Sequence, residues 1–200
     1  ENINMLEKIL VPIFFIYFVL DALSVLFPAF NKSINSGKYL NKFYIQTNNY
    51  NKDLLSQHIK KQNKSSLLIF LLYFGILTII GFFIITSDSI ENEYIYLLFF
   101  FINFADYFCI LVWCPFKSLI LKNACCNRCR IANWDRLMKF YILIFIPSIY
   151  SIILVILGVI IFFIWEYKHH SHPERFYFVS NGTLSCNMCQ YHIGCIKKKE

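Results

Sequence analysis

Apolar residues along this chain gather into four long stretches, and polar residues are concentrated between them. Each stretch carries almost no charge over roughly 20 residues, the length that a helix needs to cross a hydrocarbon core of about 30 Å. This pattern predicts an all-α integral membrane protein: a four-helix transmembrane bundle over residues 1–167, followed by a Cys/His-rich tail over 168–200. The four predicted spans are approximately 9–30, 66–86, 94–116 and 140–167.

The composition supports this class. Of the 200 residues, 58% are hydrophobic and 19% are aromatic, whereas soluble domains are about 45–50% apolar. One apolar run is also typical of a buried helix in a soluble protein, but four such runs leave too little polar sequence to cover them. The lipid bilayer is therefore the first partner that the sequence predicts.

The distribution of cations predicts the orientation of the helices. The loops 31–65 and 117–139 lie on one side of the predicted bundle and hold 13 of the 19 Lys and Arg residues. The positive-inside rule then places both loops in the cytoplasm and both termini outside. The cations Lys197 to Lys199 at the end of the tail oppose this bias. The net charge of +7 is mainly a topology signal, and the sequence shows no basic module of the kind that binds nucleic acid.

Two aspartates lie inside predicted spans, where an ionised carboxylate is costly unless it is paired or solvated. Asp21 and Asp106 have no Lys or Arg in any predicted span to pair with. Either they carry a proton or a cation, or they are neutral and form hydrogen bonds between helices, as Asn103 would. A Pro follows each Asp, Pro28 or Pro115, and this faint repeat suggests two tandem helical hairpins.

The cysteines form two groups, of which the first lies on the predicted cytoplasmic side: Cys114, Cys125, Cys126 and Cys129. Cys-x-x-Cys spacing lets two sulfurs reach one metal ion, and four thiolates complete a tetrahedral zinc site or hold an iron–sulfur cluster. The adjacent Arg128 and Arg130 favour thiolate over thiol. Cys109, inside the third span, is predicted to be a small packed hydrophobe.

The second group lies in the tail: Cys186, Cys189, His192 and Cys195, with His172 upstream. Three Cys and one His make a complete zinc ligand set. The same spacing also occurs in dithiol redox centres, and an external tail can carry a disulfide, so these alternatives stay open. With the predicted topology the two groups face opposite sides of the membrane and cannot share a metal ion.

Three hypotheses for the function follow. The first is a metal-stabilised scaffold or subunit of a membrane complex, whose two cysteine-rich faces bind a protein partner or a second copy. The second is a membrane redox or thiol–disulfide protein centred on Cys125, Cys126 and Cys129. The third is a small ion or proton transporter that uses Asp21 and Asp106. The chain has no Gly-rich phosphate loop and no His-Glu-x-x-His motif, so the sequence leaves open whether it is an enzyme.

Three motifs follow one another in the second half of the chain: Trp-Cys-Pro-Phe from Trp113, Cys-Cys-x-x-Cys-Arg-Ile-x-Asn-Trp from Cys125, and His-Pro-Glu-Arg-Phe from His172 with a later Cys-x-x-Cys. In these motifs the chain resembles a family of small uncharacterised polytopic membrane proteins from anaerobic, clostridia-like bacteria. The resemblance implies a location in the bacterial plasma membrane and implies no activity.

Overall fold

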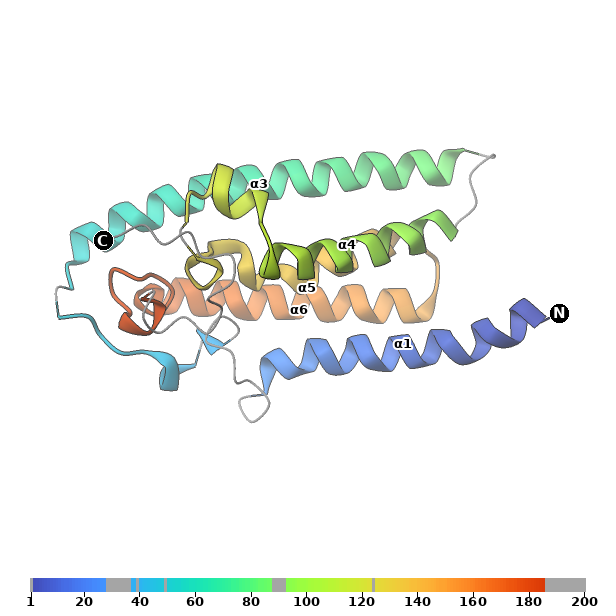
Figure 1. Ribbon diagram of the computed structural model, residues 1–200, viewed down its shortest axis with the longest axis horizontal. Coiled ribbons are helices and arrows are strands. Elements are labelled where there is room, and N and C mark those ends of the chain that lie inside the picture. The colour runs from blue at the N-terminus through green and yellow to red at the C-terminus, as the bar shows by residue number, and fades with distance from the viewer. Residues whose placement is uncertain are drawn as a thin grey trace.

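Helices make up most of the chain in the computed structural model (Figure 1). The structure describes residues 2–27, 37–38, 40–48, 50–87, 93–123 and 125–185. Its α-helices are α1 (Asn2–Leu26), α3 (Lys52–Thr86), α4 (Glu93–Leu111), α5 (Asp135–Phe140) and α6 (Ile149–Ser171). The described residues contain no β-strand and one isolated antiparallel bridge, between Gln46 and Asn181. The all-α prediction is therefore confirmed.

Short helical turns connect these helices. One is a π-helical turn, Phe116–Ile120. The 3-10 turns are Asn41–Phe43, Cys126–Arg128, Arg130–Asn133, Tyr141–Phe145, Pro173–Arg175 and Gly182–Leu184.

The apolar helices are compatible with an integral membrane protein. Among the described residues α3, α4 and α6 are each long and apolar enough to cross a membrane, and the apolar part of α1, Leu10–Leu26, is shorter. Large apolar side chains cover the outside of these helices: Ile79 is 71% exposed, Phe82 63% and Phe163 64%. Three helices of spanning length are thus found in the described chain, and the predicted count of four is not confirmed.

The helix α3 is longer than the span predicted at 66–86, because it begins in the preceding polar segment. The Asn51 side chain caps it by accepting hydrogen bonds from the amides of Asp53 and Leu54, at 2.8 and 3.4 Å. Gln62 is buried on its inner face and donates to the carbonyl of Leu121 at 3.3 Å. The polar half of α3 therefore packs on the loop that follows α4.

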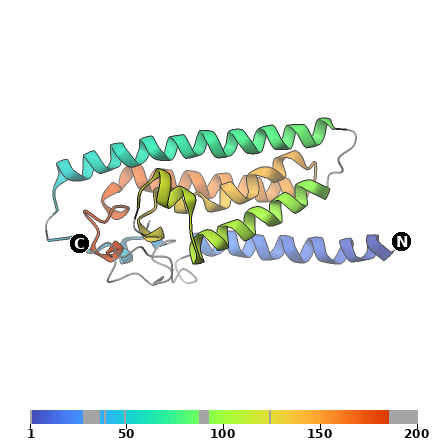
Figure 2. The same cartoon turned by 45° about the horizontal axis from the view of Figure 1, so that its top comes forward.

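The fourth predicted span, 140–167, is not one continuous helix. α5 and the turn Tyr141–Phe145 run in one direction, and α6 returns alongside them (Figures 1 and 2). The break falls at Pro147, which lacks an amide hydrogen and disfavours helical backbone at the preceding residue. Ile146 and Ser148 accordingly have extended backbone. The chain thus reverses its direction at Pro147.

Pairs of residues on the two arms show that this hairpin is antiparallel and centred on Ser148. Trp134 packs edge-on against Phe162, with ring centres 5.6 Å apart. Gly158 lets the arms approach closely, because a Cβ there would lie 3.3 Å from the Cα of Leu137.

The short arm of the hairpin lies at the centre of the bundle. Phe140 and Ile142 are fully buried, and Phe140 packs against Phe18 of α1, with ring centres 6.1 Å apart. On the α3 side the Tyr73 hydroxyl donates to the carbonyl of Met138 at 3.0 Å. The long helices therefore surround a six-residue helix that hydropathy alone does not mark as buried.

The described part of the tail lies at the same end of the bundle as the long loops. The amide of Ile45 donates to Asn181 Oδ1 at 3.2 Å, and the Thr47 hydroxyl donates to the carbonyl of Val179 at 2.9 Å. α1 begins at the opposite end (Figure 1). Residues 172–185 therefore lie at the loop end of the bundle and not at the end where α1 begins, because the short arm adds a pass. The sides of the membrane on which the loops and the termini lie stay a prediction.

Candidate functional site

Two ion pairs connect the intramembrane aspartates to α5. Asp21 Oδ1 lies 2.9 Å from Arg136 Nη2, and Asp106 Oδ2 lies 2.8 Å from Lys139 Nζ. Asp135 lies between the two cations: it contacts Arg136 and is 3.9 Å from Lys139 Nζ. The expectation that no cation is available to these aspartates is thus wrong, because α5 lies inside the bundle rather than in a loop.

These charges are largely shielded from solvent. The side chains of Arg136 and Lys139 are 12% and 6% exposed, and those of Asp21 and Asp106 are 27% and 24% exposed. The hydroxyls of Tyr17 and Tyr107 lie 3.1 Å apart and link α1 to α4 beside the ion pairs. The role that this geometry assigns to both aspartates is to hold α5 between α1 and α4.

Asn103 does not belong to this cluster. Its side-chain amide is buried and donates to the carbonyl of Phe99, one turn earlier in the same helix, at 2.8 Å. That bond satisfies the amide within α4, as expected for a structural residue.

A cavity of about 520 Å³ extends from the ion pairs to the cysteines. Its charged lining consists of Asp21, Asp106, Lys117, Asp135, Arg136 and Lys139. Its thiol lining consists of Cys109, Cys114, Cys126 and Cys129. The rest of its lining is mostly apolar, with the hydroxyl-bearing Tyr73 and Tyr107 among it, and the largest share comes from α4. The cavity therefore brings together both kinds of candidate residue that the sequence points to.

Cys109 and Cys114 line this cavity together. α4 ends at Leu111, and the bend before Pro115 returns Cys114 to the cavity that Cys109 also lines. The amide of Lys117 donates to the Cys114 sulfur at 3.5 Å. The neighbouring Cys109 thiol, and then the backbone amides of Lys117 and Phe116, lower the pKa of Cys114 to about 6. Cys109 is thus a member of the site, whereas the sequence predicted a packing role.

The other thiols of the first group lie on the short turns that follow. Cys126 Sγ is 3.9 Å from the carbonyl oxygen of Cys109. Cys129 is 5% exposed, and burial raises the pKa of its thiol to about 12. Lys38 is 1% exposed and donates to the carbonyl of Cys129 at 3.4 Å. Burial lowers the pKa of this lysine to about 8, against a smaller opposing effect of the Cys129 and Cys125 sulfurs.

The predicted metal ligands are gathered only in part. Cys114, Cys126 and Cys129 line the same cavity, and Cys125 is buried. None of the five described cysteines forms a disulfide, and no described group of three Cys, His, Asp or Glu side chains is arranged to hold one metal ion. His172 Nδ1 lies 3.3 Å from Glu174 Oε1. The remaining predicted ligands lie outside the described residues: Cys186, Cys189, His192 and Cys195.

The described end of the tail contacts the turns that carry the first cysteine group. Arg128 Nε donates to the carbonyl of Leu184 at 3.1 Å, and its guanidinium lies 4.2 Å from the ring centre of Phe178. Cys186 follows two residues after Leu184 in the sequence and lies outside the described residues. The expectation that the two cysteine groups face opposite sides of the membrane therefore stays a prediction.

A third ion pair, between Arg130 and Glu166, closes the base of the hairpin and was missed from the sequence. Arg130 Nη1 and Nη2 form two bonds with the Glu166 carboxylate, at 2.9 and 2.6 Å, and Trp134 Nε1 donates to the same carboxylate at 2.6 Å. A two-bond arrangement of this kind fixes orientation as well as charge. The feature of the sequence that could have indicated this ion pair is the charged Glu166 at the end of an apolar run.

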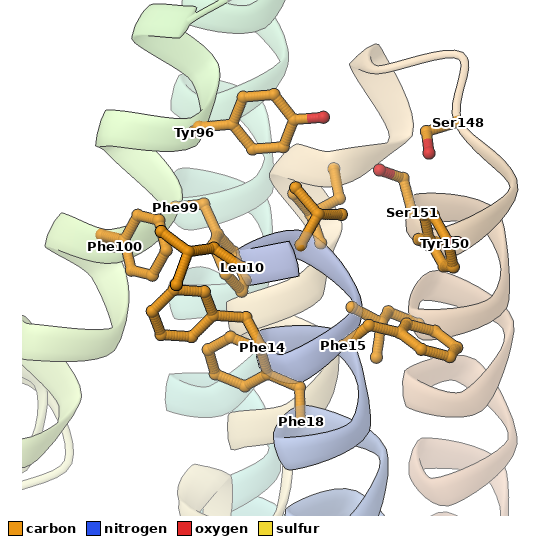
Figure 3. Close-up of a pocket in the computed structure, with 13 residues that line it drawn as sticks. Leu10, Phe14, Phe15, Phe18, Tyr96, Phe99, Phe100, Ser148, Tyr150 and Ser151 are labelled. Carbon is orange, nitrogen blue, oxygen red and sulfur yellow. The ribbon is translucent and has the colours of Figure 1, made fainter. Parts of the chain in front are cut away.

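A further cavity of about 680 Å³ lies toward the N-terminal end of α1 (Figure 3). Aromatic side chains of α1 and α4 face one another there, among them Phe14, Phe99 and Phe100 (Figure 3). Tyr150, Ser148 and Ser151 contribute its polar atoms on the α6 side. It contains no thiol and no charged lining residue, so the chemistry of the described chain is concentrated in the 520 Å³ cavity.

Comparison with known proteins adds no relative to this picture. No protein-family model, no characterised protein and no solved structure matches the chain. The resemblance to a clostridial membrane-protein family stays a prediction.

Proposed function

We propose that the chain is a membrane-embedded thiol–disulfide protein whose working pair is Cys109 and Cys114. The observation that carries this proposal is that both thiols line one cavity, which two further thiols also line. Two thiols that share a cavity can exchange two electrons by forming and breaking one S–S bond.

The surrounding groups suit this chemistry. Backbone amides that donate to the Cys114 sulfur stabilise the thiolate, which is the nucleophile in exchange reactions. Cys126, beside the carbonyl of Cys109, is placed to resolve a mixed disulfide on the pair.

The test is to map disulfides after mild oxidation. Purified protein in detergent is reduced, freed of reductant, treated with the small oxidant diamide and analysed by peptide mass spectrometry. We expect a Cys109–Cys114 disulfide, lost in Cys109→Ser and in Cys114→Ser. Cys125→Ser is the matched control, because Cys125 is 2% exposed and does not line the cavity. Oxidation that spares Cys109 and Cys114 would overturn the proposal.

The second candidate function is a metal-stabilised scaffold or subunit of a membrane complex. The bond from Arg128 to the carbonyl of Leu184 favours it, because it holds Leu184, two residues before Cys186 in the sequence, beside the turn that carries the first cysteine group. In this proposal zinc, or an iron–sulfur cluster, joins the loop to the tail. Elemental analysis of anaerobically purified protein tests it. Stoichiometric zinc or iron that falls in a Cys186→Ser variant supports a shared site, and metal-free protein refutes it.

The location proposed for the chain is the bacterial plasma membrane. The end of the bundle that carries the long loops, the thiols and the described tail holds most of the cations, and the positive-inside rule assigns such an end to the cytoplasm. The start of α1 then lies on the outer side.

A further inference from the structure

We propose that the 520 Å³ cavity binds a lipid-soluble quinone, which accepts the two electrons of the Cys109–Cys114 pair. This inference rests on the thiol–disulfide function proposed above and names the class of its oxidant. The cavity volume falls in the range of about 300–1,000 Å³ that is typical of sites for small organic ligands.

The lining holds apolar and polar side chains together, as an amphipathic ligand requires. Its apolar members include Leu77 of α3 and Leu98, Ile102 and Ala105 of α4, two helices of membrane-spanning length. Its polar members include the thiols, three cations and the three carboxylates beside them. A neutral quinone ring with an apolar chain matches both kinds of side chain, whereas a water-soluble cofactor matches only the polar kind.

The cavity borders the surface that faces lipid. Phe101 lines it and is also 63% exposed on the outside of α4. Cys109 belongs to the same helix, two residues before its end at Leu111. A ligand dissolved in the bilayer therefore has a short path to the thiol pair, while a folded protein substrate has none at this depth.

The reaction balances with the quinone as the sole oxidant. The Cys114 sulfur, as a thiolate, forms a bond with a ring carbon of the quinone. The Cys109 sulfur then attacks the Cys114 sulfur, so that the S–S bond forms as the S–C bond breaks. The electron pair of that bond leaves with the ring, which becomes a hydroquinone. One of its protons comes from the Cys109 thiol and the other from solvent, so a thiol, a thiolate, a quinone and a proton give a disulfide and a quinol.

The cations of the cavity match the charge that develops on the ring. Lys139 and Arg136 line the cavity, with side chains 6% and 12% exposed, and Lys117 is 3% exposed at its thiol end. A hydroquinone carries negative charge on oxygen until it is protonated, and buried cations stabilise such charge strongly. The carboxylates of Asp106 and Asp135 keep these side chains in place.

The experiment uses the full chain, reduced and held under anaerobic conditions in detergent. Decylubiquinone is added, and quinol formation is followed by absorbance while the disulfide is mapped by mass spectrometry. Its ring is fully substituted, so it does not alkylate thiols irreversibly. Ala105→Phe adds bulk to the apolar lining, one helical turn before Cys109, and replaces no thiol. We expect it to slow oxidation by the quinone by about ten-fold or more and to leave oxidation by diamide within about two-fold.

Gly75→Phe is the matched control, because it adds bulk on α3 where a Cβ meets nothing within 4 Å. Both of its rates should equal those of the parent. Binding is measured separately in Cys114→Ser by equilibrium dialysis with decylubiquinone, and it should persist there and be lost when Ala105→Phe is added.

The outcomes separate the two proposals. If diamide forms the disulfide and the quinone does not, the quinone site is refuted and the thiol pair stands. If neither oxidant joins Cys109 to Cys114, the thiol–disulfide function itself fails. If Ala105→Phe slows both oxidants equally, or leaves quinone binding unchanged, the cavity is not the binding site.

Discussion

Replacing Asp106 by Asn removes one charge from the cluster that holds α5. At the observed 2.8 Å from Lys139, the attraction of the pair is about 6 kcal/mol at an effective dielectric constant of about 20. Asp135, at 3.9 Å, keeps about 4 kcal/mol of attraction for the same ammonium group at that dielectric constant. Breaking a buried pair from one side typically costs about 3–5 kcal/mol. Because Asp135 remains, we expect Asp106→Asn to lower the free energy of unfolding by about 3 kcal/mol.

The assay is unfolding by sodium dodecyl sulfate in mixed micelles, followed by tryptophan fluorescence. Trp134 and Trp165 report on the hairpin, since they are 6% and 1% exposed. The double variant Asp106→Asn/Lys139→Met removes both charges, so it no longer buries an unpaired ammonium group. We expect it to be more stable than Asp106→Asn alone.

Glu93→Gln is the control, because Glu93 is exposed in the first turn of α4 and the same charge is lost there. It should change stability by less than about 1 kcal/mol. A loss for Asp106→Asn as small as that of the control, or a double variant less stable than Asp106→Asn, would show that the pair does not hold α5.

Three further predictions concern titration and packing. Lys38 loses its proton near pH 8 in the folded state and near pH 10.5 in the unfolded chain. Between these two pH values the unfolded state binds more protons, so the free energy of unfolding should rise by up to about 3 kcal/mol as the pH increases. Lys38→Met should lack this rise in unfolding curves taken at each pH. In protein kept metal-free by a chelator, alkylation of Cys114, monitored by mass spectrometry, should reach half its maximal rate near pH 6. Alkylation of the buried Cys129 should stay undetectable up to about pH 10. Equal reactivity of the two thiols would contradict the difference in their surroundings. Gly158→Leu should destabilise the fold by about 1–3 kcal/mol in the same micelle titration, because the backbone of α5 lies against this position, whereas Gly75→Leu, which points into open space, should not.

Hydropathy predicts the long helices well because each satisfies its own backbone hydrogen bonds and exposes apolar side chains to lipid. The same reasoning fails for α5, which has six residues and carries Asp135, Arg136 and Lys139. Its burial depends on partners that are distant in the chain, such as Asp21, 115 residues earlier. No local pattern contains that information, so the sequence places α5 in a loop and the tail at the opposite end of the bundle from the loops.

In the candidate site, too, some features follow from local sequence and others depend on contacts between distant residues. Cysteine spacing correctly singles out Cys114, Cys126 and Cys129 as residues that lie together. It misses Cys109, because a cysteine within an apolar helix has the same pattern whether it packs or reacts. The bend after α4 that returns Cys114 to Cys109 depends on tertiary contacts, and only the folded chain shows it.

The order of residues along the chain also matters for how the protein enters a membrane during synthesis. α5 carries three ionisable side chains and has no favourable route into hydrocarbon by itself. The ribosome makes α1 and α4 before it, so Asp21 and Asp106 are both present when Arg136 and Lys139 emerge. A circular permutation that moves α1 behind α6 would expose Arg136 to lipid before the Asp21 carboxylate exists, with only Asp135 as its partner. The order of the helices in the sequence thus means that α5 inserts after the helices that carry Asp21 and Asp106 have been made.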